Sequence, residues 1–312
     1  MALHNLELTA FFLFVIFATW LDLFVLHKDD HDIGLKEATV TSLAWILLAL
    51  LFSGYVYYRY GTEMWMQYLT AYTMEKALSV DNLFVIATIF GFFGIRGGLQ
   101  HRALAWGVIG AVAMRSLLIF LGVEAVERFS WLLPVFGVFL VVTGFKMLRE
   151  NDEEKASLED NKVYRLLSRV LPVYPGYDGH AVITRRNGRW ELTLLGMAIV
   201  MVEATDLLFA VDSIPAVMAI SQDFFIVLTS NIFAILGLRA LYFLLAGILG
   251  KFRYLSLGLA FVLLFIGGKM LVLPFGIHVE TWISLSVVLG TITIAILASL
   301  LIPEKTRPES AD

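Results

Sequence analysis

The feature that most constrains this chain is a series of long apolar runs separated by short polar segments. A bilayer core about 30 Å thick is spanned by roughly 20 apolar residues in a helix. Nine runs of about this length occur in the 312 residues, at 8–26, 39–58, 69–93, 103–123, 131–148, 192–220, 224–249, 254–273 and 281–302. The first run lacks a preceding basic residue and a small-residue cleavage site, so it reads as a span and not as a signal peptide. The sequence therefore predicts an all-α polytopic membrane protein with about nine transmembrane helices.

Composition supports this class and excludes several others. Hydrophobic residues make up 59% of the chain and charged residues 16%, whereas soluble domains have about 45–50% and 25%. A net charge of −4 argues against a nucleic-acid partner. Because the chain has no Cys, it has no disulfide, no thiolate metal site and no thiol redox centre.

The distribution of Lys and Arg predicts the orientation in the membrane. Five of the 23 basic residues lie inside the runs. If the N-terminus is outside, the outer segments hold only Arg59 and Arg128, and the inner segments hold the other 16. Since cytoplasmic loops carry the excess of Lys and Arg, we expect the N-terminus outside and the C-terminus in the cytoplasm.

The long connection at 149–191 falls on the predicted cytoplasmic side. Within it, apolar residues keep helical spacing at Val163, Leu166, Leu167, Val170 and Leu171. Arg165 and Arg169 lie between them and Pro172 ends the pattern, which predicts an amphipathic helix on the inner leaflet. Asn187-Gly188 predicts a hairpin turn. The alternative is a linker with surface charge.

Charged residues inside the runs reveal an internal repeat. EKALSVDNLFVIATIF aligns with DLLFAVDSIPAVMAI, and GFKML aligns with GGKML. The aligned charged positions are Glu75 with Asp206, Asp81 with Asp212, Arg115 with Arg239, and Lys146 with Lys269. Each unit has three spans, so the second unit is inverted, which is typical of transporters. Chance similarity between Leu-rich helices is the alternative, and ordered charges argue against it.

The predicted organisation is a single membrane domain, 1–312. It comprises two peripheral spans at 8–58, a first repeat at 69–148, the cytoplasmic loop at 149–191, an inverted second repeat at 192–273 and a last span at 281–302.

Acidic residues in a membrane are expensive and indicate function. Six lie in the runs: Asp22, Glu75, Asp81, Glu203, Asp206 and Asp212. Asp22 is expected at the membrane interface, and the other five lie in the spans that lead the two repeats. The bases Lys76, Arg115 and Arg239 are expected to balance part of this charge, and a cation would remove the rest.

Helix geometry suggests how these acids meet. Glu203 and Asp206 share a helix face at i and i+3. We expect the helix to open near Asp212, because Pro215 lacks the N–H that the next turn needs. The alternative is a simple kink. Ser213 and Asn82 add neutral oxygens at aligned positions.

All-oxygen ligation favours Mn²⁺, Ca²⁺ or Mg²⁺. The His and Asp residues between His27 and Asp32 are expected to form a solvated loop, and the methionines of the two acidic spans are expected to pack. The local sequences SVDN and AVDS lack the GxGD motif of intramembrane aspartyl proteases, so we do not expect an enzyme. No nucleotide-binding P-loop occurs either.

The segments EKALSVDNLFV, VEATDLLFAVDSIPAV and FIVLTSNIFAILGLRALYFLLAG resemble the TerC family, in particular its Alx-type members, and the resemblance covers roughly 18–273. It implies an inverted-repeat protein of the bacterial inner membrane that exports Mn²⁺, with Ca²⁺ and Mg²⁺ less favoured and no organic cofactor. It implies a metal site at Glu75, Asp81, Glu203, Asp206 and Asp212.

The sequence thus predicts a secondary transporter that exports a divalent metal cation, with proton antiport as the expected energy source. The expected partners are the metal ion and the lipid bilayer. The alternative is a membrane metal sensor or scaffold of the tellurium-resistance or redox-modulator type that transports nothing.

Overall fold

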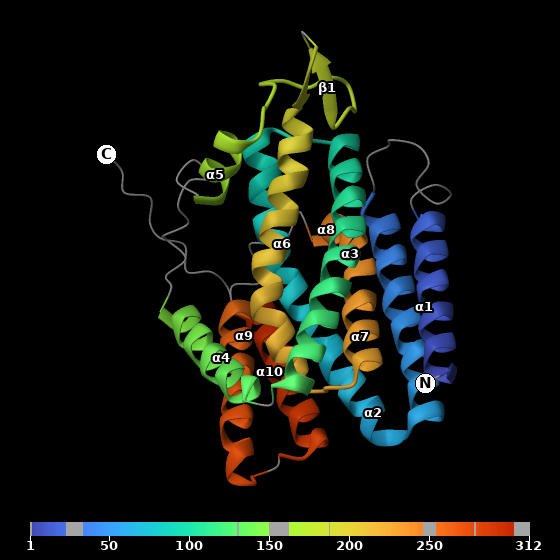
Figure 1. Ribbon diagram of the computed structural model, residues 1–312, viewed down its shortest axis with the longest axis vertical. Helices are drawn as coiled ribbons and strands as arrows, with labels where there is room; N and C mark the ends of the chain where they lie inside the picture. The colour runs from blue at the N-terminus through green and yellow to red at the C-terminus, as the bar shows by residue number, and fades with distance from the viewer. Residues whose placement is uncertain are drawn as a thin grey trace.

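The computed structural model describes residues 2–22, 34–129, 131–149, 162–186, 188–245, 254–277 and 279–302. These residues form α-helices, one short 3-10 turn and one β-hairpin (Figure 1). The elements in chain order are α1 (Ala2–Leu21), α2 (Leu35–Phe93), α3 (Gly98–Arg128), α4 (Leu132–Arg149), α5 (Lys162–Val170), β1 (Ile183–Arg186), β2 (Arg189–Leu192), α6 (Leu194–Met218), α7 (Phe224–Leu236), α8 (Leu238–Leu245), α9 (Leu255–Val272), η5 (Leu273–Phe275) and α10 (Thr281–Leu301).

The helices confirm the predicted all-α polytopic membrane fold. Six helices in the described part of the chain are long and apolar enough to cross a membrane. A seventh span results if α7 and α8, which are bent by 41° relative to each other, are counted as one. The predicted number of nine is not established by these helix lengths, and it stays a prediction.

Gly61 divides α2 into two helices that correspond to the second and third predicted runs. Its backbone has φ 84° and ψ −178°, a conformation that residues with a Cβ rarely adopt. The chain reverses here, so that the first half of α2 lies next to α1 and the second half enters the bundle (Figure 1). Glu7 of α1 accepts hydrogen bonds from Arg59 and Tyr60 just before the reversal.

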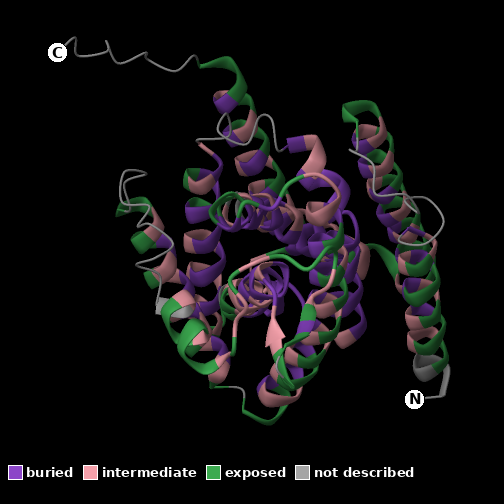
Figure 2. Cartoon of the chain, turned by 90° about the horizontal axis from the view of Figure 1, so that it is seen from above, coloured by how far each residue is buried: buried purple, intermediate pink, exposed green. Residues whose placement is uncertain are grey.

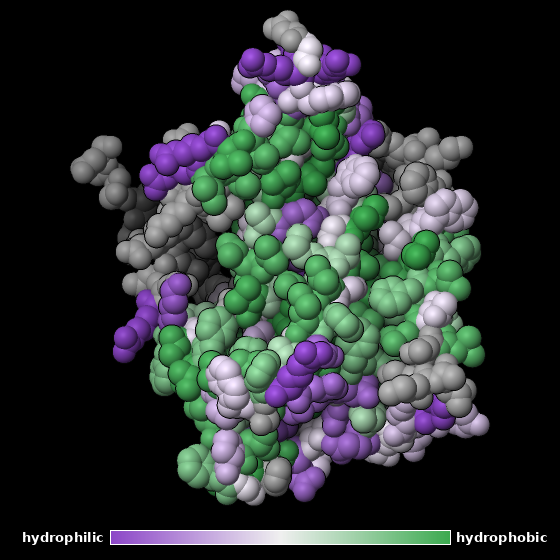
Figure 3. Space-filling view, viewed as in Figure 1, coloured by the Kyte–Doolittle hydropathy of each residue, from purple (hydrophilic) through white to green (hydrophobic). Residues whose placement is uncertain are grey.

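Large apolar side chains cover the outer surface. Leu13 of α1, Leu47 of α2, Val138 of α4 and Ile294 of α10 are each more than half exposed. Hydrophilic residues gather at the two ends of the molecule, and a predominantly apolar belt lies between them (Figure 3). Water-soluble monomers rarely expose apolar surface of this extent, whereas lipid chains cover it without penalty.

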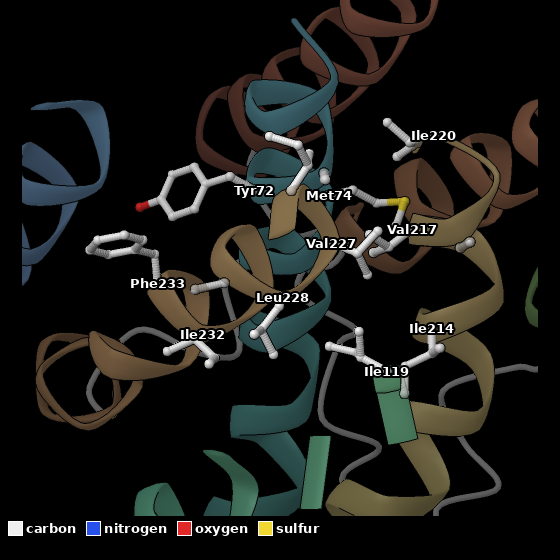
Figure 4. Packing of buried hydrophobic residues seen from close by; sticks show 14 of the residues in the cluster. Tyr72, Met74, Ile119, Ile214, Val217, Ile220, Val227, Leu228, Ile232 and Phe233 are labelled. Carbon is white, nitrogen blue, oxygen red and sulfur yellow. The ribbon is translucent and has the colours of Figure 1, made fainter. Parts of the chain in front are cut away.

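The core lies where α2, α3, α6 and α7 meet. Figure 4 shows Met74 of α2, Ile119 of α3, Ile214 of α6 and Leu228 of α7 as members of one apolar cluster, and all four are buried. Buried residues concentrate in the inner helices, while α1 and the first half of α2 lie at the edge (Figure 2). The two spans that carry the predicted acids are therefore central.

Helices α4 and α9 approach closely at small residues. A Cβ added at Gly144 would lie 3.0 Å from the carbonyl oxygen of Ala260, and one added at Gly267 would lie 2.8 Å from that of Gly137. In the alignment of the two repeats Gly144 corresponds to Gly267 and Gly137 to Ala260. The contact of Gly144 with Ala260 in one unit therefore has its counterpart in the contact of Gly267 with Gly137. A twofold relation between the units would produce this reciprocity. The repeat itself stays a prediction.

The long connection contains the predicted helix and hairpin. Helix α5 ends at Val170, two residues before Pro172. Strands β1 and β2 pair antiparallel with Arg186 opposite Arg189, and Gly188 in the turn has φ 76°. Asn187, the first part of the connection and the His27 to Asp32 cluster lie outside the described residues.

Candidate cation site

Arg115 of α3 is the centre of a buried ionic group. Its Nη1 donates to Oε2 of Glu75 on α2 at 2.7 Å. Its Nε and Nη2 donate to the two carboxylate oxygens of Asp206 on α6 at 3.0 and 2.7 Å, the fork geometry that suits guanidinium and carboxylate. The side chains of Arg115 and Glu75 are 2% and 1% exposed. Arg115 therefore joins the two acids that are aligned in the predicted repeat.

The carboxylate of Glu203, one turn before Asp206 on α6, is buried, although the residue as a whole is partly exposed. Neither of its carboxylate oxygens has a hydrogen-bond partner among the described residues. The carboxylate lies directly against the backbone of Gly110 on α3, because a Cβ added there would fall 2.3 Å from Oε1. Any side chain at this position of α3 would collide with the carboxylate. A buried ionised carboxylate without a donor is costly, so this group is a candidate for binding a proton or a cation.

Asn231 of α7 belongs to the same group, although the sequence analysis did not select it. It is fully buried, and its Oδ1 lies 3.4 Å from Nη1 of Arg115. Its Nδ2 has no partner among the described residues. The preceding Thr229 and Ser230 donate to carbonyls of their own helix. The only available signal was this short polar segment in an apolar run, and it does not distinguish Asn231 from its neighbours.

Glu75 has one unbonded carboxylate oxygen and a hydroxyl neighbour. Its Oε1 is buried without a hydrogen-bond partner in the described part of the chain. The hydroxyl of Ser213 faces this carboxylate without reaching a well-formed hydrogen bond. Ser213 and Asn82, the two predicted additional ligands, are both buried.

The side chains of Asp81 and Asp212 lie outside the description, although their backbones belong to α2 and α6. Among the side chains that are described, no three His, Asp or Glu residues come together as a metal-binding group. Glu75 and Asp206 converge on Arg115, and Glu203 lies against α3. The full set of five predicted acids therefore remains a prediction.

The three predicted charge-balancing bases have different partners. Arg115 contacts the acids, whereas Arg239 forms an ion pair with Asp22, Nη2 to Oδ1, at 2.7 Å. Nη1 of Arg239 also lies 3.0 Å from Nε2 of His101. Asp22, which was expected at the membrane interface, is buried in this pair. Lys76 donates to the carbonyl of Ala234 at 3.1 Å.

The predicted opening of α6 near Asp212 is wrong. The helix continues through Pro215 to Met218, and the N–H of Ala219 donates to the Pro215 carbonyl at 3.0 Å. Pro215 lies in the last turn, so the missing N–H removes one backbone hydrogen bond without interrupting the helix.

The observed break lies at Gly237, between α7 and α8. Ala234 belongs to the last turn of α7, where helix carbonyls carry partial negative charge and favour a cation. Lys76 supplies that cation. A Cβ at Gly237 would lie 2.8 Å from the Lys76 Nζ and 3.1 Å from Cβ of Trp45, so a side chain there would displace the Lys76 ammonium.

Comparison with known proteins adds a family. Residues 60–307 match the model of the integral membrane protein TerC family. An uncharacterized membrane protein of Myxococcus xanthus is 45% identical over 302 residues, covering 97% of this chain and 94% of that protein. Alx of Escherichia coli strain K12, for which a role as membrane-bound redox modulator is proposed, is 42% identical over 271 residues and 84% of each chain.

A membrane protein of Rickettsia felis is 40% identical over 281 residues, covering 90% of this chain and 93% of the relative. No solved structure matches. The family match covers most of the chain, and the relatives align along nearly their whole length. The chain therefore belongs to the integral membrane protein TerC family.

Proposed function

We propose that this protein is a secondary transporter that moves a divalent metal cation, Mn²⁺ in the first place, out of the cytoplasm. The observation that carries the proposal is the Glu203 carboxylate, whose two oxygens are buried without a partner among the described residues. An ionised carboxylate in such a place needs a cation or a proton. Arg115 is already bonded to Glu75 and Asp206, so the neutralising charge has to come from elsewhere.

The charge of the group suits exchange of a divalent cation for protons. When ionised, Glu75, Glu203 and Asp206 together with Arg115 carry a net charge of −2. One divalent cation or two protons neutralise this charge. Exchange of one for the other would leave the charge of the site unchanged, also when Asp81 and Asp212 add their own charges, which supports proton antiport.

The donor set favours a hard cation. Glu203 and the unbonded Oε1 of Glu75 offer carboxylate oxygens, and Ser213 offers a hydroxyl. Oxygen donors suit Mn²⁺, Ca²⁺ and Mg²⁺, and the resemblance to the TerC family favours Mn²⁺ among them. Asp81 and Asp212 complete the proposed ligand set, and Asn82 is proposed as a further oxygen donor.

Export is the direction that requires coupling. Moving a cation outward against an inside-negative potential costs about 2.3 kcal/mol per charge for each 100 mV. Proton entry through the same acids would offset this cost. We place the protein in the bacterial inner membrane with its C-terminus in the cytoplasm, because the relatives are bacterial membrane proteins and because Lys and Arg accumulate on one side.

A metal sensor or scaffold is the second candidate. It is favoured by the role proposed for the relative Alx. The chain has no Cys, so thiol exchange would have to be carried by a partner. A sensor binds metal but transports none.

Flux measurements separate these candidates. The purified protein is reconstituted into vesicles that enclose a Mn²⁺-sensitive dye, with Ca²⁺ and Mg²⁺ as competitors and with an imposed pH gradient. Glu203→Gln and Asp212→Asn test the site. Glu124→Gln is the matched control, because Glu124 is exposed and pairs with Arg128 in its own helix.

Saturable Mn²⁺ flux that both site variants abolish and the control retains would support transport. A rate of Mn²⁺ flux that does not change with the pH gradient would refute proton antiport. Metal binding without flux would favour the sensor. Absence of both binding and flux would refute a metal function for these acids.

A further inference from the structure

Helix α5 leaves an apolar stripe uncovered. Tyr164 and Leu167 face the protein and pack against the buried apolar cluster below α5. Leu166 and Val170, which are four residues apart and so lie on one helix face, are 63% and 70% exposed. A nine-residue helix with apolar side chains on two of its sides needs a second apolar environment besides the protein.

The contacts of Tyr164 place α5 beside the C-terminal end of α2. Its ring packs edge-on against Phe92 at 5.3 Å and Phe93 at 6.2 Å between ring centroids. These phenylalanines are the last two residues of α2, which ends at Gly94. Helix α5 therefore lies where this membrane-length helix ends, while the β-hairpin projects further from the bundle (Figure 1).

Basic side chains flank the uncovered stripe. Arg165 and Arg169, on the adjacent face of α5, are both exposed. The hairpin adds three exposed arginines, Arg185, Arg186 and Arg189. The acidic residues in the range 164–192 are Asp178 and Glu191. Within 164–192 five arginines therefore outnumber two acids, while the acids at 152–160 lie outside the described residues.

We propose that α5 docks onto anionic phospholipid of the leaflet beside it, with Leu166 and Val170 at the boundary of the acyl chains and Arg165 and Arg169 on the lipid phosphates. An amphipathic helix with an apolar face and basic flanks binds in this manner. A protein partner would have to cover the stripe at the depth of the lipid headgroups. The charge and the level of α5 both favour lipid.

The docked helix would act on the site-bearing helix. Tyr164 contacts the end of α2, and the hydroxyl of Tyr177 donates to the carbonyl of Phe93. The same helix carries Glu75 further along. The lipid-bound segment is thus attached to the end of α2 at two points.

The absence of Cys from the chain permits a direct test in the full-length protein. Leu166→Cys and Val170→Cys are labelled singly with a nitroxide, and Arg189→Cys in the hairpin is the control. The protein is reconstituted into phosphatidylcholine vesicles with or without phosphatidylglycerol. Electron paramagnetic resonance then compares how often oxygen, which enters the bilayer, and a nickel chelate, which does not, collide with each label.

With phosphatidylglycerol present, we expect oxygen to exceed the nickel chelate at both α5 labels and the reverse at the hairpin label. Without it, or in the Arg165→Gln, Arg169→Gln variant, the α5 labels should move toward water, since each arginine contributes about fivefold to the equilibrium. Labels on α5 that behave like the hairpin label in both lipids would overturn the proposal. An unchanged depth without phosphatidylglycerol would overturn the anionic requirement. Protection from both agents in detergent would mean that protein covers the stripe, and would overturn it as well.

Discussion

Replacing Gly110 by alanine tests whether the Glu203 carboxylate binds the metal. A Cβ at this position would lie 2.3 Å from Oε1 and 2.5 Å from Oε2 of Glu203. Non-bonded heavy atoms settle near 3.5 Å, so the carboxylate has to retreat by roughly 1 Å. It is the end of a flexible side chain, so the movement changes its position without disturbing the packing of α3 on α6.

The expected effect is a loss of metal affinity at nearly constant stability. Disturbing a group that orients a metal ligand typically lowers affinity about 10–100-fold, which corresponds to about 1.4–2.7 kcal/mol. The free energy of unfolding should change by less than about 1 kcal/mol, because alanine also favours the helix relative to glycine. Affinity and stability should therefore separate in this variant.

Gly107→Ala provides the matched control one turn earlier. A Cβ there would lie 3.5 Å from Cγ1 of Val202 and 3.9 Å from Oε1 of Glu203, which are ordinary contact distances. Half-saturation for Mn²⁺ flux and thermal unfolding in detergent are measured for both variants. The reasoning fails if Gly110→Ala saturates at the same Mn²⁺ concentration as Gly107→Ala. Should Gly110→Ala not fold, Glu203→Gln decides the same question.

Three further substitutions test other parts of the structure. Arg115→Gln leaves the buried Glu75 and the partly buried Asp206 without their cation, and thermal unfolding should show a loss of about 3–5 kcal/mol. Arg115→Lys should be less affected, and equal loss in both variants would contradict the role of the two-pronged contact. Lys76→Met removes the donor to the Ala234 carbonyl, and we expect about 1–3 kcal/mol lower stability with unchanged Mn²⁺ affinity in calorimetry. Gly144→Leu forces α4 away from the Ala260 carbonyl and should lower the yield of folded protein, whereas wild-type yield would argue against close helix contact.

The sequence was sufficient for the fold class, because apolar length is a direct consequence of bilayer thickness. It also located α5 and the hairpin, since helical spacing, Pro172 and Gly188 are local signals. The sequence analysis did not single out Gly61 as the point of reversal, and this residue lies between two predicted runs. The break at Gly237 was missed because a single glycine in an apolar run has no distinct pattern, whereas Pro215 looked like a break and is not one.

The site was predictable only in part. Charged residues in apolar runs are rare enough to select Glu75, Glu203 and Asp206 from the sequence. Their pairing was not visible, because it depends on which faces of α2, α3 and α6 meet. Asn231 and Gly110 were missed for the same reason. An amide that points to a neighbouring helix and a glycine that makes room for a carboxylate are defined by three-dimensional neighbours.

The contact between α4 and α9 has a mechanical consequence. At Gly144 and Gly267 each helix meets the backbone of the other, and the side chains of Leu264 and Val141 fill the space beside the two glycines. Side chains lodged beside a glycine hold two helices in one register, so α4 and α9 are expected to move as one rigid pair. The bonds from Arg115 to Glu75 and Asp206 are short and directional, so they hold α2, α3 and α6 together. Under the proposed transport function, a movement that opens the acids first to one side of the membrane and then to the other would carry α4 and α9 together and break the bonds of Arg115.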